Sequence, residues 1–272
     1  MTSLEENNMT TTSYSNQSTF LKKLLFRIQL LPILLRSGLR KRHNSFKYLS
    51  DIRKFIEAGG AVTHLFPILN EYKEQAGTAT GHYFHQDLLV ASLIHEVNPK
   101  RHIDVGSRID GFVAHVAAFR TIEVLDFRPL ISCGHKQIKF MQADLMSLGS
   151  HLFEITDSLS CLHALEHFGL GRYGDPINPN GHLIGFINLH KMLKAGGNLY
   201  ISFPIGVNSV YFNAHRVFEP SEILKWSKGL FKLERFDYVD DQGDLHQNQF
   251  LESVPSLNYG CGIYTMTKIA SA

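Results

Sequence analysis

The sequence predicts an α/β fold in which a mostly parallel, doubly wound sheet carries helices on both faces. After Pro99, short β-rich segments alternate with helical stretches and Gly-containing turns, and the connections are long enough to cross over a sheet. The expected strands are residues 102–106, 122–127, 138–145, 158–165, 198–206, 231–239 and 262–268. Ligands of such sheets bind beyond the carboxyl ends of the strands, so the chemistry is expected just after each strand.

The last two expected strands, 231–239 and 262–268, have only a short gap between them. This predicts an antiparallel pair that closes one edge of the sheet. The expected architecture is therefore Rossmann-like: a seven-stranded, mostly parallel sheet with one antiparallel edge strand, preceded by a helical N-terminal extension.

The composition is that of a globular protein in a reducing compartment. Of 272 residues, 44% are apolar and 19% are charged, which excludes a disordered chain. The net charge is only +2, so the total charge does not predict electrostatic binding to nucleic acid. The three cysteines lie far apart and form no CxxC pair, which argues against a disulfide scaffold or a thiolate zinc site. We therefore expect a cytoplasmic protein.

Three regions are expected along the chain. Residues 1–18 are polar and predict a disordered leader, residues 19–97 predict a helical, basic and amphipathic extension, and residues 98–272 hold the α/β domain. The apolar segment 20–42 cannot span a membrane, because its longest uncharged run, 28–35, is too short. Two interpretations remain for it: a helix docked on the domain, or peripheral contact with the inner face of an anionic membrane.

Acidic residues follow the first three expected strands. Asp104 precedes Gly106 in a turn where a glycine lets backbone amides approach a ligand closely. Asp126 follows Gly106 by twenty residues, a spacing that suits hydrogen bonds from ribose hydroxyls. Asp144 ends the third strand, where it can accept a hydrogen bond from an adenine amine. Any one of these acids could equally be a helix cap, but together they favour a nucleotide-like ligand.

This arrangement resembles the class I S-adenosylmethionine-dependent methyltransferases over residues 82–268, and LKAGGNLYISFP is similar to the Gly-Gly turn before their fifth strand. More narrowly, GHYFHQDL, DVGSRIDGF, SLSCLHALEHFGLGRYGDP, FNAHRVF and GCGIYTMTK resemble a little-characterised methyltransferase-like family catalogued as a domain of unknown function. The resemblance implies S-adenosylmethionine as the cofactor. The residues it assigns to the cofactor are Asp104, Gly106, Ser107, Gly111, Asp126 and Asp144.

One position departs from the pattern of that superfamily. Its turn usually reads Gly-x-Gly-x-Gly, whereas Arg108 occupies the middle glycine position here and Asp110 precedes Gly111. A cation beside a sulfonium cofactor needs a partner, which Asp104, Asp110 or the carboxylate of the cofactor could supply. The alternative function is therefore a non-catalytic member of the fold, a binding or scaffold protein that the N-terminal helix could hold at a membrane surface.

Polar residues are densest after the fourth expected strand. Methyl transfer requires orientation of donor and acceptor, and a general base where the acceptor loses a proton. The candidate bases are His163, Glu166 and His167, with His215 after the fifth strand. A structural role at the strand end is the competing interpretation for His163. The acceptor is expected to be a small molecule or a glycan, because residues outside 22–54 show no basic patch and no NPPY-like motif.

Two other classes of enzyme share parts of this sequence pattern. HALEH, residues 163–167, has the spacing of an HxxEH zinc site, but the glycines that follow leave no long helix for the ligands. HYFH, residues 82–85, could also bind metal, yet no Cys or acidic cluster completes it nearby in sequence, so no metal is expected. For a nicotinamide enzyme, GSRIDG lacks the second glycine of GxGxxG that the pyrophosphate needs.

Overall fold

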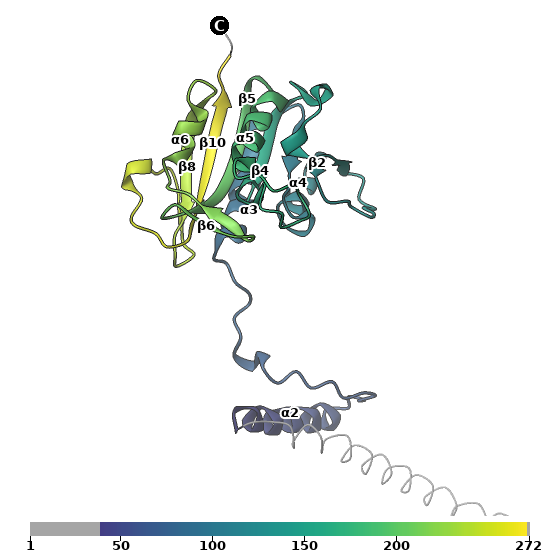
Figure 1. Ribbon diagram of the computed structural model, residues 1–272. Coiled ribbons are helices and arrows are strands. Elements are labelled where there is room, and N and C mark those ends of the chain that lie inside the picture. The colour runs from purple at the N-terminus through teal and green to yellow at the C-terminus, as the bar shows by residue number, and fades with distance from the viewer. Residues whose placement is uncertain (1–38, 271–272) are drawn as a thin grey trace, which may run out of the picture. The chain divides into compact units, whose positions relative to one another are not determined.

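The structure, a computed structural model, describes residues 39–270, with side chains from residue 43 onward. The chain divides into two compact units, residues 1–78 and residues 79–272 (Figure 1). The leader expected at residues 1–18 lies outside the described residues, as does nearly all of segment 20–42. Between residues 39 and 270, no helix is both long and apolar enough to cross a membrane.

The described part of the first unit is built around helix α2, Leu39–Glu57. After this helix the chain folds back, so that the ammonium of Lys47 lies 4.6 Å from the ring centroid of Tyr72. Between residues 58 and 81 the only regular element is the short 3-10 helix η1, Glu71–Lys73. The N-terminal extension is therefore helical only in part.

The second unit is built on an eight-stranded sheet with the order β3-β2-β1-β4-β5-β10-β8-β9. The strands are β1 His102–Val105, β2 Ile122–Asp126, β3 Ile138–Gln142, β4 Thr156–Leu162, β5 Leu193–Ile205, β8 Phe231–Val239, β9 Leu245–His246 and β10 Gly260–Lys268. A separate hairpin joins β6, Ser209–Tyr211, to β7, His215–Val217. Strands β3, β2, β1, β4 and β5 pair in parallel. The predicted fold class, a mostly parallel Rossmann-like α/β sheet, is confirmed.

The antiparallel part of the sheet differs in detail from the expectation. Strand β10 is antiparallel to both β5 and β8, so it lies inside the sheet, and the two-residue β9 adds an eighth strand at the edge. The sequence of β10 explains its place: Cys261, Ile263, Tyr264 and Met266 are almost fully buried. A strand that is apolar on both faces requires neighbours and covering helices that an edge strand does not have.

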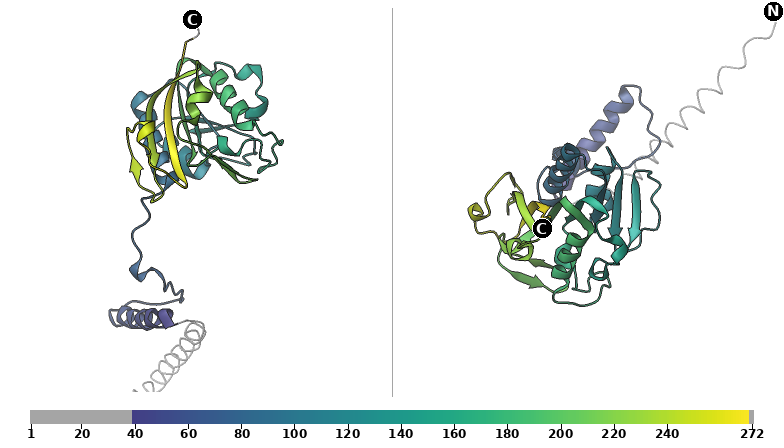
Figure 2. Two further views of the ribbon diagram at one scale, coloured as in Figure 1. Left: turned by 60° about the vertical axis from the view of Figure 1, so that its left-hand side comes forward. Right: turned by 90° about the horizontal axis from the view of Figure 1, so that it is seen from above.

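Helices cover both faces of the sheet. Side chains alternate between the two faces of a strand, and Leu199 and Ile201 accordingly pack in one core cluster while Tyr200 packs in the other. Helix α5, Gly181–Met192, contributes to the first cluster, and helix α3, His82–Val97, contributes to the second. Figure 2 shows helices on either side of the strands. The sheet is therefore doubly wound, as predicted.

The remaining helices between residues 79 and 270 are short. They are the π-helix η2 Ile109–Val113, α4 Ala114–Ala117, η3 Leu145–Ser147, η4 Ser150–Leu152, η5 Leu165–His167, α6 Glu222–Ser227 and η6 Leu251–Ser253. Helix α3 was grouped with the extension 19–97 in the sequence analysis. In the structure it packs within the second unit, because Val90 and Ile94 share a buried cluster with Phe112.

Candidate active site

The buried carboxylate of Asp104 stabilises the turn after β1. The carboxylate of Asp104 accepts hydrogen bonds from the backbone N of Ser107 at 3.1 Å, from Ser107 Oγ at 2.8 Å and from Ser160 Oγ at 2.5 Å. Burial raises the pKa of Asp104 to about 7, although these hydrogen bonds oppose the shift. Asp104 is completely buried and lines neither of the cavities described below. It shapes the turn, while Ser107 reaches the second of these cavities.

Gly106 lies at the tightest point of this turn. Its φ of +78° is left-handed, and a Cβ atom would lie 2.9 Å from the Cβ of Ala164. Gly111 follows in η2, where a Cβ atom would lie 2.9 Å from Asp87 Oδ2. Glycine is therefore required by conformation and by space at Gly106, whereas at Gly111 a Cβ atom would only displace the carboxylate of Asp87.

Arg108 does not fill the turn. Its guanidinium forms an exposed, two-pronged pair with Asp110, with Nη2 to Oδ2 at 2.7 Å and Nε to Oδ1 at 3.0 Å. Of the partners expected for Arg108, the structure gives Asp110. The arginine at the middle glycine position therefore leaves the space beside Gly106 open.

A first cavity lies at the carboxyl ends of β1, β2 and β3, and Gly106, Asp126 and Asp144 line it together. Most of its remaining wall is apolar, with Val105, Leu125, Phe127, Ala143, Leu145, Met146, Ala164 and Phe168. Of the three acids predicted after these strands, the structure thus brings two to one cavity. Asp175 also lines this cavity, but its carboxylate accepts hydrogen bonds from the backbone N of Gly169, Gly171 and Tyr173. The cavity is narrow, with a volume of about 70 Å³. Its apolar wall and the carboxylates of Asp126 and Asp144 suit the chemistry of an adenosine group, whose base is flat and whose amine and hydroxyls donate hydrogen bonds.

Both carboxylates have partners within the protein. Asp126 accepts hydrogen bonds from the backbone N, Nε and Nη2 of Arg128 at 2.8, 3.0 and 2.6 Å. The guanidinium of Arg128 also lies 4.6 Å from the ring centroid of Tyr173. Asp144 accepts a hydrogen bond from the backbone N of Met146 at 2.8 Å and so caps η3. A helix cap was the alternative role that the sequence allowed for this acid. Arg128 was not predicted from the sequence, although a cation two residues after Asp126 is a visible signal.

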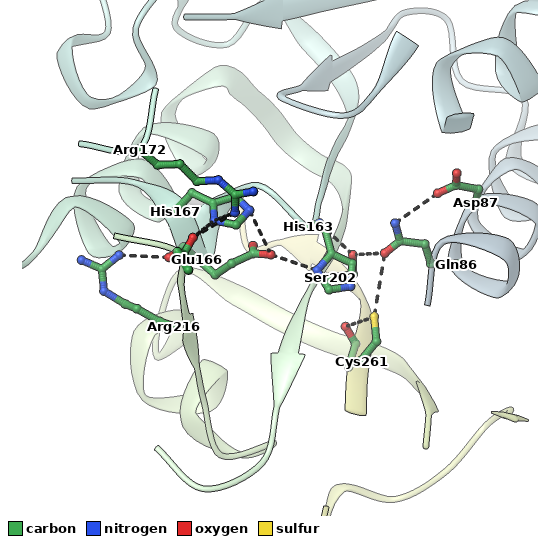
Figure 3. A network of polar contacts seen from close by, with 11 residues as sticks. Gln86, Asp87, His163, Glu166, His167, Arg172, Ser202, Arg216 and Cys261 are labelled. Carbon is green, nitrogen blue, oxygen red and sulfur yellow. Dashed lines mark hydrogen bonds and ion pairs between the residues drawn. The ribbon is translucent and has the colours of Figure 1, made fainter. Parts of the chain in front are cut away.

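His163 and Glu166 form a buried pair after β4 (Figure 3). His163 Nδ1 donates to Glu166 Oε1 at 2.9 Å, and the two side chains are only 4% and 1% exposed. Burial opposes the charged form of His163, but Cys261 and Glu166 hold its pKa well above the usual range. Burial likewise opposes a charged Glu166, but His163 lowers the pKa of that carboxyl. The two groups form an ion pair, and both line the second cavity described below.

His167 and His215 are the more accessible of the predicted bases. Nδ1 of His167 donates to the carbonyl of Ala214 at 2.7 Å, which leaves its Nε2 as an acceptor. Burial lowers the pKa of both His167 and His215, so both rings are neutral at neutral pH. The HALEH segment holds only the three-residue η5, as its glycines predicted, so its two histidines do not stand on one helix.

A second, polar cavity of about 540 Å³ adjoins the first. Its size falls within the range of about 300–1,000 Å³ typical of small-molecule sites. The two cavities share Gly106, Arg128, His163, His167 and Tyr173. Lining residues of the second cavity that the sequence analysis missed are Gln86, Asp87 and Tyr259. They come from α3 and from the turn before β10, and no local spacing links them to the β4 segment.

Comparison with solved structures identifies the fold. The 1,6-didemethyltoxoflavin-N1-methyltransferase of Burkholderia thailandensis, solved with bound 1,6-didemethyltoxoflavin and S-adenosylhomocysteine, is 14% identical, with a TM-score of 0.51 over 86% of this chain and 93% of that chain. The chain has the class I S-adenosylmethionine-dependent methyltransferase fold. The resemblance predicted from the sequence is thus confirmed at the level of the fold.

Further matches to solved structures have lower TM-scores. The N-methyltransferase NodS of Bradyrhizobium japonicum WM9 is 11% identical, with a TM-score of 0.46 over 69% of this chain and 88% of that chain. A putative methyltransferase of Bacillus halodurans C-125 is 15% identical, with a TM-score of 0.48 over 66% and 99% of the two chains. The family model described as "Caenorhabditis protein of unknown function, DUF268" matches residues 136–252, in agreement with the narrower resemblance. A search of curated proteins gives no match.

Proposed function

We propose that this protein is an S-adenosylmethionine-dependent methyltransferase that acts on a small-molecule or glycan acceptor. The observation that carries the proposal is the first cavity, where Asp126 and Asp144 meet beside Gly106 at the carboxyl ends of three neighbouring strands. In doubly wound sheets this edge is where ligands bind. Asp126 would hold the ribose hydroxyls, and Asp144 would lie beside the adenine.

In this proposal the first cavity binds the methyl donor and the second cavity binds the acceptor. Bound in the first cavity, S-adenosylmethionine supplies an electrophilic methyl group. His167 stands where the cavities meet, and its neutral Nε2 can take a proton from an acceptor in the second cavity. Arg108 and Arg172 also line the second cavity, and their donors suit the oxygens of a polar acceptor. His215 offers a second base on the same wall.

One observation favours the alternative, a non-catalytic binding or scaffold protein. Asp126 already accepts three hydrogen bonds from Arg128, so a ribose must share that carboxylate or displace the guanidinium. A carboxylate offers about four acceptor sites, so sharing leaves room for one ribose hydroxyl and displacement of the side chain leaves room for both. Binding of the cofactor separates the two functions.

Titration calorimetry with S-adenosylhomocysteine tests the proposal. We expect saturable binding by the wild-type protein and a loss of about 10- to 100-fold in affinity on Asp126→Ala, because a hydrogen bond to a charged group contributes about 1.5–3 kcal/mol. Glu123→Ala is the matched control, since this acid lies on the same strand but pairs with Arg101 at 2.7 Å and lines neither cavity. Absence of binding by the wild-type protein across the millimolar range would reject the methyltransferase and favour the scaffold.

A further inference from the structure

Three metal-binding side chains converge behind the second cavity. They are His82 at the start of α3, His163 after β4 and Cys261 at the start of β10. One ligand atom from each residue lies within 4.8 Å of the others. No cysteine lies near the 82–85 motif in the sequence, and the fold supplies one from the other end of the chain.

His163 has a buried nitrogen with no other use. Its Nδ1 is bonded to Glu166, but its Nε2 is buried and has no hydrogen-bond partner. A buried polar atom without a partner costs about 1–3 kcal/mol, so it calls for a physical explanation. In Figure 3 this side of the ring faces the sulfur of Cys261.

Glu166 completes a pattern found around bound metals. A histidine that ligates a metal through one nitrogen commonly donates its other N–H to a carboxylate, which fixes the ring and raises its basicity. The His163 Nδ1 to Glu166 Oε1 bond of 2.9 Å has this form. The ring of His82 is stacked on that of His163, with centroids 5.2 Å apart and an interplanar angle of 8°. Two imidazoles and one sulfur are thus held together at one point.

We propose that His82, His163 and Cys261 bind a zinc ion. Two imidazoles and a thiolate are a donor set that suits zinc, with bonds of about 2.0–2.3 Å. The ligand atoms of such a site lie about 3.3–3.6 Å apart, so small side-chain rotations would close the group around the ion. On binding, Cys261 releases its thiol proton and the charged His163 ring releases its Nε2 proton, both to solvent. The fourth position is left for water or for a heteroatom of a molecule in the second cavity, which His163 and Tyr259 line. The zinc site goes beyond methyl transfer and stands without it.

Cobalt substitution in the full-length protein tests this site. One equivalent of Co²⁺ is expected to give the visible bands of a four-coordinate ion and a thiolate-to-cobalt charge-transfer band in the near ultraviolet, both removed by one equivalent of Zn²⁺. Cys261→Ser should abolish the charge-transfer band. Cys161→Ser and Cys133→Ser, which change a buried and an exposed cysteine outside the group, should keep it.

A second variant covers the case in which Cys261→Ser does not fold. His82→Phe keeps a ring to stack on His163 but removes the ligand nitrogen, and we expect at least a tenfold loss of zinc affinity against a chromophoric chelator. A wild-type protein without the charge-transfer band overturns the proposal. So does a band that survives in folded Cys261→Ser, or unchanged zinc affinity in His82→Phe, because cobalt and zinc would then be bound at other cysteines or at exposed histidines.

Discussion

Gly106→Val is expected to lower the free energy of unfolding by about 3 kcal/mol and to abolish binding of S-adenosylhomocysteine. The backbone of Gly106 has a φ of +78°, a left-handed conformation that costs other residues about 1–2 kcal/mol and β-branched ones more. Its missing Cβ would lie 2.9 Å from the Cβ of Ala164, and overpacking of this kind costs about 1–3 kcal/mol. Gly106 also lines both cavities, so a side chain there intrudes on the ligand. Urea unfolding and calorimetry measure the two effects.

Gly196→Val is the matched control for this prediction. Gly196 has a φ of +72°, but nothing lies within 4 Å of the position of its missing Cβ. Valine at this position therefore has the same cost of a left-handed backbone but no close contact of its Cβ atom. Gly196 lines neither cavity. We expect a smaller loss of stability and unchanged affinity. Equal losses in the two variants would show that the close approach to Ala164 does not matter.

Arg216→Leu is expected to lower the free energy of unfolding by about 3–5 kcal/mol. Arg216 is only 4% exposed, and its guanidinium donates to three backbone carbonyls: those of Glu166 at 3.2 Å, Phe168 at 2.7 Å and Pro179 at 3.2 Å. It thereby ties the segment after β4 to strand β7. Leucine leaves these carbonyls without their donor, at about 1–3 kcal/mol for each one that stays buried. Urea unfolding measures the loss.

Arg172→Leu provides the comparison for Arg216. Arg172 is exposed at the surface, and its guanidinium donates a hydrogen bond of 3.0 Å to the carbonyl of Ala214. Its replacement is expected to change stability by less than about 1 kcal/mol, as surface substitutions usually do. If Arg172→Leu and Arg216→Leu unfold at the same urea concentration, the hydrogen bonds of Arg216 to the three carbonyls do not stabilise the segment after β4. Since the segment after β4 contains His167, an Arg216→Leu protein that still folds should also lose the proposed methyl transfer.

The strands of the sheet could be predicted because each is a short apolar segment between turns. Parallel strands that are buried on both faces give such segments, and β1, β2, β4 and β5 show this burial. The position of β10 inside the sheet could not be predicted, because its pairing with β5, a strand far away along the chain, determines it. The shared cavity of Asp126 and Asp144 followed from the common edge of parallel strands.

The other site residues depend on contacts that no local pattern encodes. Asp104 was expected beside the cofactor, but its carboxylate is buried below the turn and bonded to Ser160 on β4. Cys261 meets His82 and His163 only because the fold brings β10 to the carboxyl end of β4 and the start of α3. Spacing along the chain predicted which strand ends carry polar residues, but not which way each side chain points.

The crystal structure of the complex with S-adenosylhomocysteine tests most directly whether the first cavity is an adenosyl site. We predict the adenine beside Asp144 and the ribose hydroxyls on Asp126, with the guanidinium of Arg128 shifted from its present contacts of 3.0 and 2.6 Å. Ligand bound outside this cavity, or an unchanged pair of Asp126 and Arg128 above an empty cavity at saturating ligand, would contradict the assignment.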